Sequence, residues 1–105
     1  MIHHVVLLRL LPGISRAGLE PLVSILTGLA ASLDGVEEYR VGLDLALRET
    51  NEDLAIVARF RDREALHTYL THPEHLSALA RFGPDLVAEK HSVQFDDEAA
   101  VCLGR

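Results

Sequence analysis

Several residue types that mark specialised protein classes are scarce in this sequence. The 105 residues include a single cysteine, Cys102, which excludes an internal disulfide framework and a multi-cysteine metal cluster. Glycines number seven and prolines four, and no low-complexity tract occurs, so disorder is not expected. With 49% hydrophobic residues, the composition predicts one globular domain with a packed core. Cys102 has no patterned partner and is interpreted as an ordinary thiol.

Basic residues are also few, because ten Lys and Arg stand against sixteen Asp and Glu and give a formal charge of −6. The nearest approach to a basic stripe, Arg59, Arg61 and Arg63, is offset by Asp62 and Glu64. We therefore expect no nucleic-acid partner and no membrane partner. No apolar run approaches the ~18 residues of a membrane span, and the start lacks the features of a signal peptide, so the expected location is cytoplasmic.

Hydrophobic periodicity predicts strands over residues 2–11, 36–47, 54–61 and 91–95, with a five-residue turn over 49–53. Apolar spacings of three and four predict a helix over residues 15–33 and a helical region over 62–82. Pro21 requires the first helix to begin near Gly18 or to bend. Pro73 disfavours helical geometry at His72, so one helix should end there and another should begin. Gly83 is the predicted end of that second helix.

This order of elements predicts an α+β fold of the ferredoxin-like βαββαβ type, with a four-stranded antiparallel sheet and helices on one face. Residues 1–96 would form the domain and residues 97–105 a C-terminal tail. The first strand is apolar on both faces, although the helices cover only one. We therefore expect a homodimer in which two bare sheet faces meet as a dimeric α/β barrel.

Six histidines are the main candidates for chemistry, since imidazole can act near neutral pH as an acid, a base or a metal ligand. The alternative without chemistry is that most of these histidines are surface residues or hydrogen-bonded structural residues. His72 and His75 have i,i+3 spacing, but no His-Glu-x-x-His motif and no nearby carboxylate or cysteine pattern completes a metal site. We therefore expect no bound metal. A glycine-rich phosphate loop and a Gly-x-Ser-x-Gly motif are both absent.

Tyr69 and His75 are six residues apart, and in one straight helix they would lie about 240° apart. A break at Pro73 can redirect the second segment and bring His75 toward Tyr69. His4 shares its strand face with apolar residues, so these three side chains could line a pocket over an apolar floor. Such a pocket has the ingredients for general-base chemistry on a carbonyl compound. The structural alternative is a buried tyrosine hydrogen-bonded to a histidine.

The sequence resembles the stress-responsive A/B-barrel (Dabb) family over nearly its whole length. The resemblance lies in His-Val-Val-Leu-Leu-Arg-Leu at residues 4–10, in the block over residues 54–75, and in Ser-Val-Gln-Phe-Asp at residues 92–96. Its most distinctive part is Tyr-x-x-His-Pro-x-His, which runs from Tyr69 to His75. The resemblance implies a ferredoxin-like fold and a homodimeric barrel.

A plant polyketide cyclase in this family closes a linear polyketide by aldol condensation without metal or organic cofactor. The resemblance to it implies that Tyr69 and His75 are catalytic and that His4 contacts the substrate. Leu54 and His72 are further candidate substrate-binding positions, and Leu54 stands where the cyclase has another pocket histidine.

Three functional hypotheses follow from these observations. The first is a cyclase or lyase that uses no cofactor and acts on a small apolar or aromatic compound. The second is a non-catalytic, stress-related dimer that binds a ligand or has a structural role. The third is a cofactor-independent monooxygenase of the related dimeric-barrel type, although no tryptophan or asparagine-rich pocket supports it.

Overall fold

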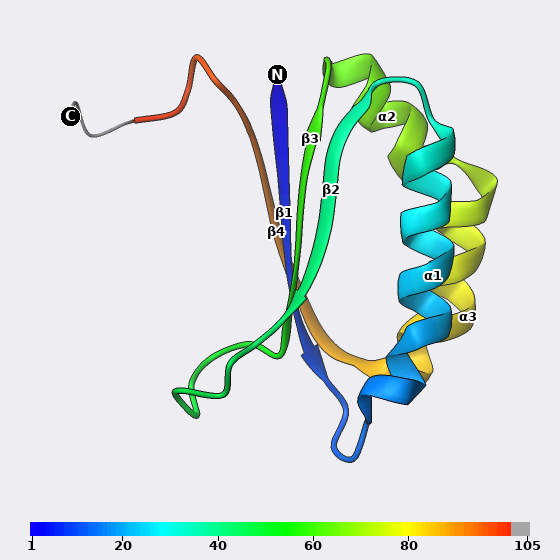
Figure 1. Cartoon of the computed structure of the whole chain (residues 1–105), viewed down its shortest axis with the longest axis vertical. Helices are drawn as coiled ribbons and strands as arrows, with labels where there is room; N and C mark the ends of the chain where they lie inside the picture. The colour runs from blue at the N-terminus through cyan, green and yellow to red at the C-terminus, as the bar shows by residue number, and fades with distance from the viewer. Residues whose placement is uncertain (102–105) are drawn as a thin grey trace.

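A four-stranded antiparallel sheet with helices on one side makes up the structure, a computed structural model that describes residues 1–101 (Figure 1). Cys102, interpreted above as an ordinary thiol, lies outside the described residues. The elements are β1 (Ile2–Leu10), α1 (Arg16–Ser32), β2 (Val36–Leu43), β3 (Leu54–Phe60), α2 (Arg63–Thr71), α3 (Pro73–Leu86) and β4 (Val87–Asp96). The strand order β2-β3-β1-β4 places β1 at the centre and β4 at one edge. The predicted ferredoxin-like fold is thereby confirmed.

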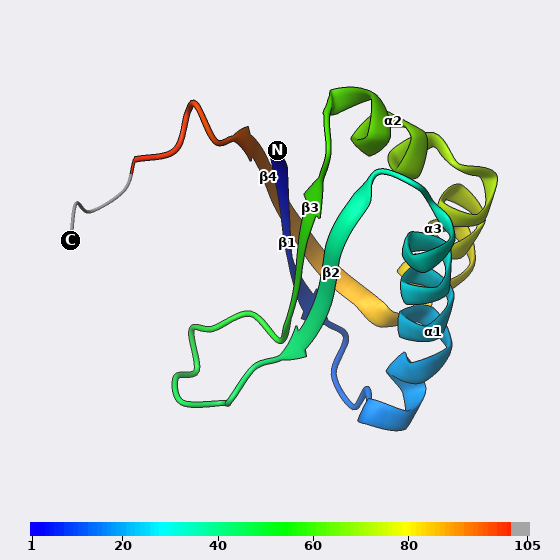
Figure 2. The same ribbon diagram turned by 45° about the horizontal axis from the view of Figure 1, so that its top comes forward.

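Alternation in the central strands separates a buried face from an open face. On β1 and β3 the even-numbered residues are buried beneath the helices, and Val6 pairs with Ile56 there. Leu22 and Leu26 of α1 complete this core. Figure 2 shows all three helices on the same side of the sheet. Because side chains alternate along a strand, the odd-numbered ones point to the other side of the sheet. Within residues 1–101, no helix covers that side.

The first helix begins at Arg16, so the alternative start near Gly18 is wrong. Ser15 is the N-cap, and its hydroxyl accepts a hydrogen bond from the backbone N–H of Gly18. Pro21 therefore lies inside α1. The helix tolerates it because the Pro21 region is exposed, so water can reach the carbonyl of residue 17 that loses its helical partner. None of the helices within residues 1–101 meets the length and hydropathy of a membrane-spanning segment.

Strand β2 ends at Leu43, four residues earlier than the alternating pattern predicted. The backbone N–H of Asp44 still bonds to Asp53 at 2.9 Å, but beyond it the chain leaves the sheet. The Asp44 carboxylate accepts a hydrogen bond from the backbone N–H of Ala46, which holds the loop in a separate turn. Leu45 and Leu47 are consequently 80% and 77% exposed. The loop over residues 44–53 projects on the side of the sheet away from the helices (Figure 1).

The second helical region breaks at His72, as the sequence predicted. His72 has an extended ψ of 136° and serves both as the C-cap of α2 and as the N-cap of α3. The predicted end of α3 at Gly83 is wrong, because the helix continues through Pro84 to Leu86. Pro84 is exposed, so water can reach the carbonyl of residue 80, which lacks the N–H that proline cannot supply.

The buried face of α3 leaves out one of the large apolar residues of the helix. Leu76 is 54% exposed, whereas His75 and Ala78 are buried. Strand β4 follows α3 directly and begins at Val87, four residues before the predicted start. Its helix-facing positions include Lys90 and other polar residues, so hydrophobic alternation could not reveal the first part of the strand.

Candidate functional site

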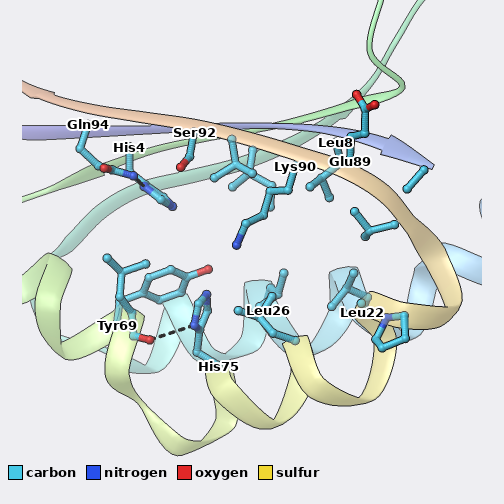
Figure 3. A pocket seen from close by; sticks show the side chains of 18 residues that line it. His4, Leu8, Leu22, Leu26, Tyr69, His75, Glu89, Lys90, Ser92 and Gln94 are labelled. Carbon is cyan, nitrogen blue, oxygen red and sulfur yellow. Dashed lines mark hydrogen bonds between the residues drawn. The ribbon is translucent and has the colours of Figure 1, made fainter. Parts of the chain in front are cut away.

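A cavity of about 580 Å³ lies between the sheet and the helix layer (Figure 3). Strands β1 and β4 form one wall, and α1, α2 and α3 form the other (Figure 3). The apolar part of its lining includes Val6, Leu8, Leu22, Leu26, Ile56, Leu70 and Leu79. The polar part includes His4, Tyr69, His75, Lys90, Ser92 and Gln94. This volume lies within the range of small-molecule sites, which are mostly apolar with a few placed polar groups.

His75 is a buried histidine whose hydrogen bond leaves one ring nitrogen free. Its Nδ1 lies 3.0 Å from the carbonyl oxygen of Leu70, and this contact is a hydrogen bond only if Nδ1 carries the proton. Nε2 therefore keeps its lone pair, and the ring points into the cavity (Figure 3). Burial lowers the pKa of His75, and the charges of Lys90 and His72 lower it further, against the raising effect of the Leu70 bond. The ring is thus an unprotonated base at neutral pH.

Tyr69 and His75 come together because α2 and α3 are separate helices. Their ring centroids lie 4.6 Å apart, and both side chains face the cavity (Figure 3). Tyr69 is only 1% exposed, and burial raises the pKa of its hydroxyl above the usual value. The side chain therefore remains a neutral phenol that can donate one hydrogen bond.

Tyr39 of β2 forms a hydrogen bond with Tyr69, and the sequence predictions missed this residue. The two hydroxyl oxygens lie 2.7 Å apart and share a hydrogen bond. Burial is the main reason why the pKa of Tyr39 is also raised. Tyr39 stood in the alternating pattern of β2 as an apolar residue, and nothing in that pattern indicated a partner thirty residues later in the chain.

His4 lies on the opposite wall of the cavity, at the sheet. Its Nδ1 lies 2.9 Å from Nε2 of Gln94, so an amide N–H of Gln94 donates to Nδ1 and the His4 proton sits on Nε2. Figure 3 shows the other ring nitrogen directed into the cavity. Burial lowers the pKa of His4 to about 4, with smaller contributions from His75 and Lys90. His4 is therefore a neutral hydrogen-bond donor at neutral pH.

The other two candidate substrate-binding residues lie elsewhere. Leu54 is buried in the core between sheet and helices, and the cavity lining does not include it. His72 uses its Nδ1 to accept a hydrogen bond from the backbone N–H of Glu74, 3.1 Å away, which caps α3. The structure thus brings His4, Tyr69 and His75 together and leaves Leu54 and His72 outside the cavity.

The face of β4 that lines the cavity is polar and was not singled out from the sequence. Lys90, Ser92 and Gln94 alternate along this edge strand and line the cavity, and their side chains are labelled in Figure 3. Only the outward-facing residues of β4 follow the hydrophobic alternation that predicted the strand. The same alternation, applied to the even-numbered residues between the apolar ones, would have placed these polar side chains on the helix-facing side of the strand.

Within residues 1–101, Glu52, Glu89 and His91 have ligand atoms that lie within 4.8 Å of one another, on the other face of the sheet. The guanidinium of Arg9 already pairs with Glu52 at 2.6 Å and approaches Glu89 to 3.9 Å. Because a cation of the protein occupies this group, we assign no metal to it.

The sequence matches the family model described as Stress Responsive A/B Barrel Domain over residues 2–98. A comparison with curated protein sequences finds no match. Among solved structures, a dimeric ferredoxin-like protein of unknown function from Thermobifida fusca is 32% identical, with a TM-score of 0.77 over 90% of this chain and 88% of that one.

Two further structures share the fold at lower identity. A Dabb family protein from Mesorhizobium loti is 16% identical, with a TM-score of 0.74 over 98% of this chain and 97% of that one. A hydroxynitrile lyase from Passiflora edulis is 16% identical, with a TM-score of 0.76 over 90% of each chain. The family match covers nearly the whole chain and agrees with the fold described above. This chain therefore belongs to the stress-responsive A/B-barrel (Dabb) domain family.

Proposed function

We propose that the cavity binds a small, largely apolar carbonyl compound and catalyses cyclase-like or lyase-like proton transfer on it without a cofactor. The observation that supports this function is the pair of neutral groups, the His75 imidazole and the Tyr69 phenol, facing one apolar cavity with ring centroids 4.6 Å apart. A base and a hydrogen-bond donor facing a largely apolar site are the requirements for enolate chemistry.

Each group has a defined role in the proposed reaction. Nε2 of His75 removes a proton from the carbon next to a carbonyl group, and the Tyr69 hydroxyl donates a hydrogen bond to the enolate oxygen that forms. The enolate carbon then attacks a second carbonyl of the same molecule, and protonated His75 returns its proton to the resulting alkoxide. His4 donates from Nε2 to the substrate, and Tyr39 holds the Tyr69 hydroxyl in place.

The hydroxynitrile lyase among the structural neighbours supports the proposal only at the level of the fold. It is an enzyme by name, and it has the same architecture at 16% identity. Fold alone does not transfer an activity, so the proposal for this chain rests on its own cavity and side chains.

The direct test is turnover of a panel of poly-β-keto thioesters by the wild type, Tyr69→Phe and His75→Ala. We expect cyclised products from the wild type and at least a roughly 100-fold lower rate for His75→Ala, because general-base catalysis contributes this much. Tyr69→Phe should lower the rate and leave folding intact. His67→Ala is the matched control, since His67 is an exposed histidine of α2 outside this cavity. Equal product distributions in all proteins and in buffer would remove the enzymatic proposal.

The non-catalytic alternative has one specific observation in its favour, because a largely apolar cavity of about 580 Å³ is sufficient for ligand binding without chemistry. Saturable binding of a panel compound with no turnover would support it over the enzymatic proposal. Oxidation of anthrone-like substrates in air would instead indicate the monooxygenase, and no oxidation would dismiss it.

We further infer that the protein functions as a homodimer. The uncovered face of the sheet has an apolar centre composed of Val5, Leu7, Ala55, Val57 and Val93, which are cross-strand neighbours on β1, β3 and β4. Charged residues surround it, including Arg59 paired with Glu38 at 2.9 Å. An apolar centre with a polar rim is the usual composition of a protein interface. The T. fusca neighbour is itself described as dimeric.

A further inference from the structure

Lys90 is the only lysine in the 105-residue sequence, and its side chain enters the cavity (Figure 3). It extends from the edge strand β4 toward the space above His75 and Leu26 (Figure 3). The residue as a whole is exposed, while Figure 3 shows the amino nitrogen of Lys90 directed into the cavity. The roles proposed above for His75, Tyr69 and His4 leave this cation without a function.

The positive charge of Lys90 has no counter-charge inside the cavity. Within residues 1–101, none of the ion pairs includes Lys90. Glu89 is the one acidic residue among those that line the cavity, but its carboxylate points away from it (Figure 3). There it lies 3.6 Å from His91 and 3.9 Å from Arg9, on the opposite face of the sheet. The cavity is therefore positive at one point and otherwise neutral.

The effect of this charge reaches the two histidines. Lys90 contributes to the lowered pKa of both His4 and His75, since a nearby cation disfavours a second positive charge. An anion bound beside Lys90 would cancel this contribution and raise the pKa of both rings. Charge on a ligand would thus make His75 a stronger base at the moment when the substrate is present.

The remaining lining agrees with an amphipathic ligand. The β4 wall offers the Ser92 hydroxyl next to Lys90, and the facing helix wall offers Leu22 and Leu26 (Figure 3). Resting on the substrate site proposed above, we propose that its ligand carries a carboxylate or a similar single anionic group, which pairs with Lys90 while the apolar body packs against the leucines of α1. The ligand class is therefore an apolar organic acid that also has a carbonyl group within reach of Tyr69 and His75.

Binding of matched eight-carbon probes tests this inference independently of turnover. Octanoate, octanamide and octylammonium each have eight carbons in an unbranched chain and differ in head-group charge. We expect octanoate to bind the wild type best in calorimetric titration, and Lys90→Met to weaken its binding about tenfold, as for the loss of one charge-assisted contact. Lys90→Arg should retain octanoate binding, and octanamide should bind the wild type and Lys90→Met equally. Added salt should weaken octanoate binding alone.

Chemical labelling gives a second measurement that does not depend on variants. An amine-reactive reagent can modify only Lys90 and the amino terminus, because the sequence has no other lysine. Octanoate should slow the labelling of Lys90, and the amino terminus is the internal control. Equal affinity for octanoate and octanamide, or unchanged octanoate binding in Lys90→Met, would overturn the inference. If octanoate binds through Lys90 but no poly-β-keto compound reacts, either as the thioester or as the free acid, the ligand class stands and the proposed reaction fails. The reverse pattern retains the reaction alone.

Discussion

At the scale of single residues, burial keeps the histidines and tyrosines in and beside the cavity neutral. His4 and His75 have lowered pKa values and Tyr39 and Tyr69 have raised ones, in each case mainly because of burial. Burial disfavours the charged form of a side chain, whichever sign the charge has. Neutral imidazole and neutral phenol are the forms that a general base and a hydrogen-bond donor require. The proposed chemistry therefore follows from where the fold places these residues.

The lowered pKa of His4 predicts an acid-sensitive fold. Its pKa is about 4 in the folded protein and 6.5 in the reference state, so between these values the unfolded chain binds a proton that the folded chain does not. The His4 contribution to stability is full above pH 6.5 and is lost as the pH falls toward 4. We expect His4→Gln to reduce the loss of unfolding free energy between pH 7 and pH 5 by roughly 1–2 kcal/mol.

Urea denaturation at the two pH values measures this effect. The comparison is the difference between pH 7 and pH 5 within each protein, so any uniform destabilisation by the substitution cancels. His67→Gln, at an exposed position of α2, should behave like the wild type. A wild-type pH dependence in His4→Gln would show that His4 titrates normally and is not the neutral donor described here.

At the scale of elements, the periodicity of hydrophobic residues identified each helix and strand. The ends of these elements depend instead on individual prolines, hydrogen bonds and solvent exposure. The α2–α3 break was predictable because Pro73 acts on the residue directly before it. The end of β2 was not, because it depends on the Asp44 carboxylate bonding within the loop. The continuation of α3 through Pro84 depends on exposure, which is a property of the folded molecule.

In the candidate site too, the residues constrained by local sequence patterns were predictable, and those placed by tertiary packing were not. His4, Tyr69 and His75 were found because strand alternation and the helix break constrain them directly. Tyr39 and Lys90 were missed, since their positions depend on cross-sheet packing and on the register of an edge strand. His72 illustrates the opposite case, because its place in the motif suggested substrate contact whereas its side chain caps a helix.

The capping contact of His72 predicts which property its substitution changes. His72→Ala removes the acceptor for the backbone N–H of Glu74 and should lower the unfolding free energy by about 1 kcal/mol. His72→Asn should recover most of this loss, because asparagine is a good N-cap residue. Thermal or urea unfolding measures both values. Neither substitution should alter octanoate affinity, and a selective loss of ligand binding with normal stability would return His72 to the set of substrate contacts.

At the scale of the whole molecule, the helices and the loop lie on opposite sides of the sheet. The helix side carries the cavity, and the other side carries the apolar centre and the loop over residues 44–53 (Figures 1 and 2). Leu45 and Leu47 add exposed apolar surface in this loop. A dimer through the sheet face would bury the apolar centre and leave the two cavities separate, so that each subunit could react independently.

Two side chains with the same exposure allow a matched test of this dimer. Val93, in the apolar centre of the sheet, and Leu76, on the outer surface of α3, are both 54% exposed. Val93→Glu should shift the protein to monomer in sedimentation equilibrium at micromolar concentration, because it would place an unpaired charge within the interface. Leu76→Glu should remain dimeric, since it introduces the same charge on the helix side. A wild type that sediments as a monomer, or a Val93→Glu variant that stays dimeric, would exclude the sheet face as the interface.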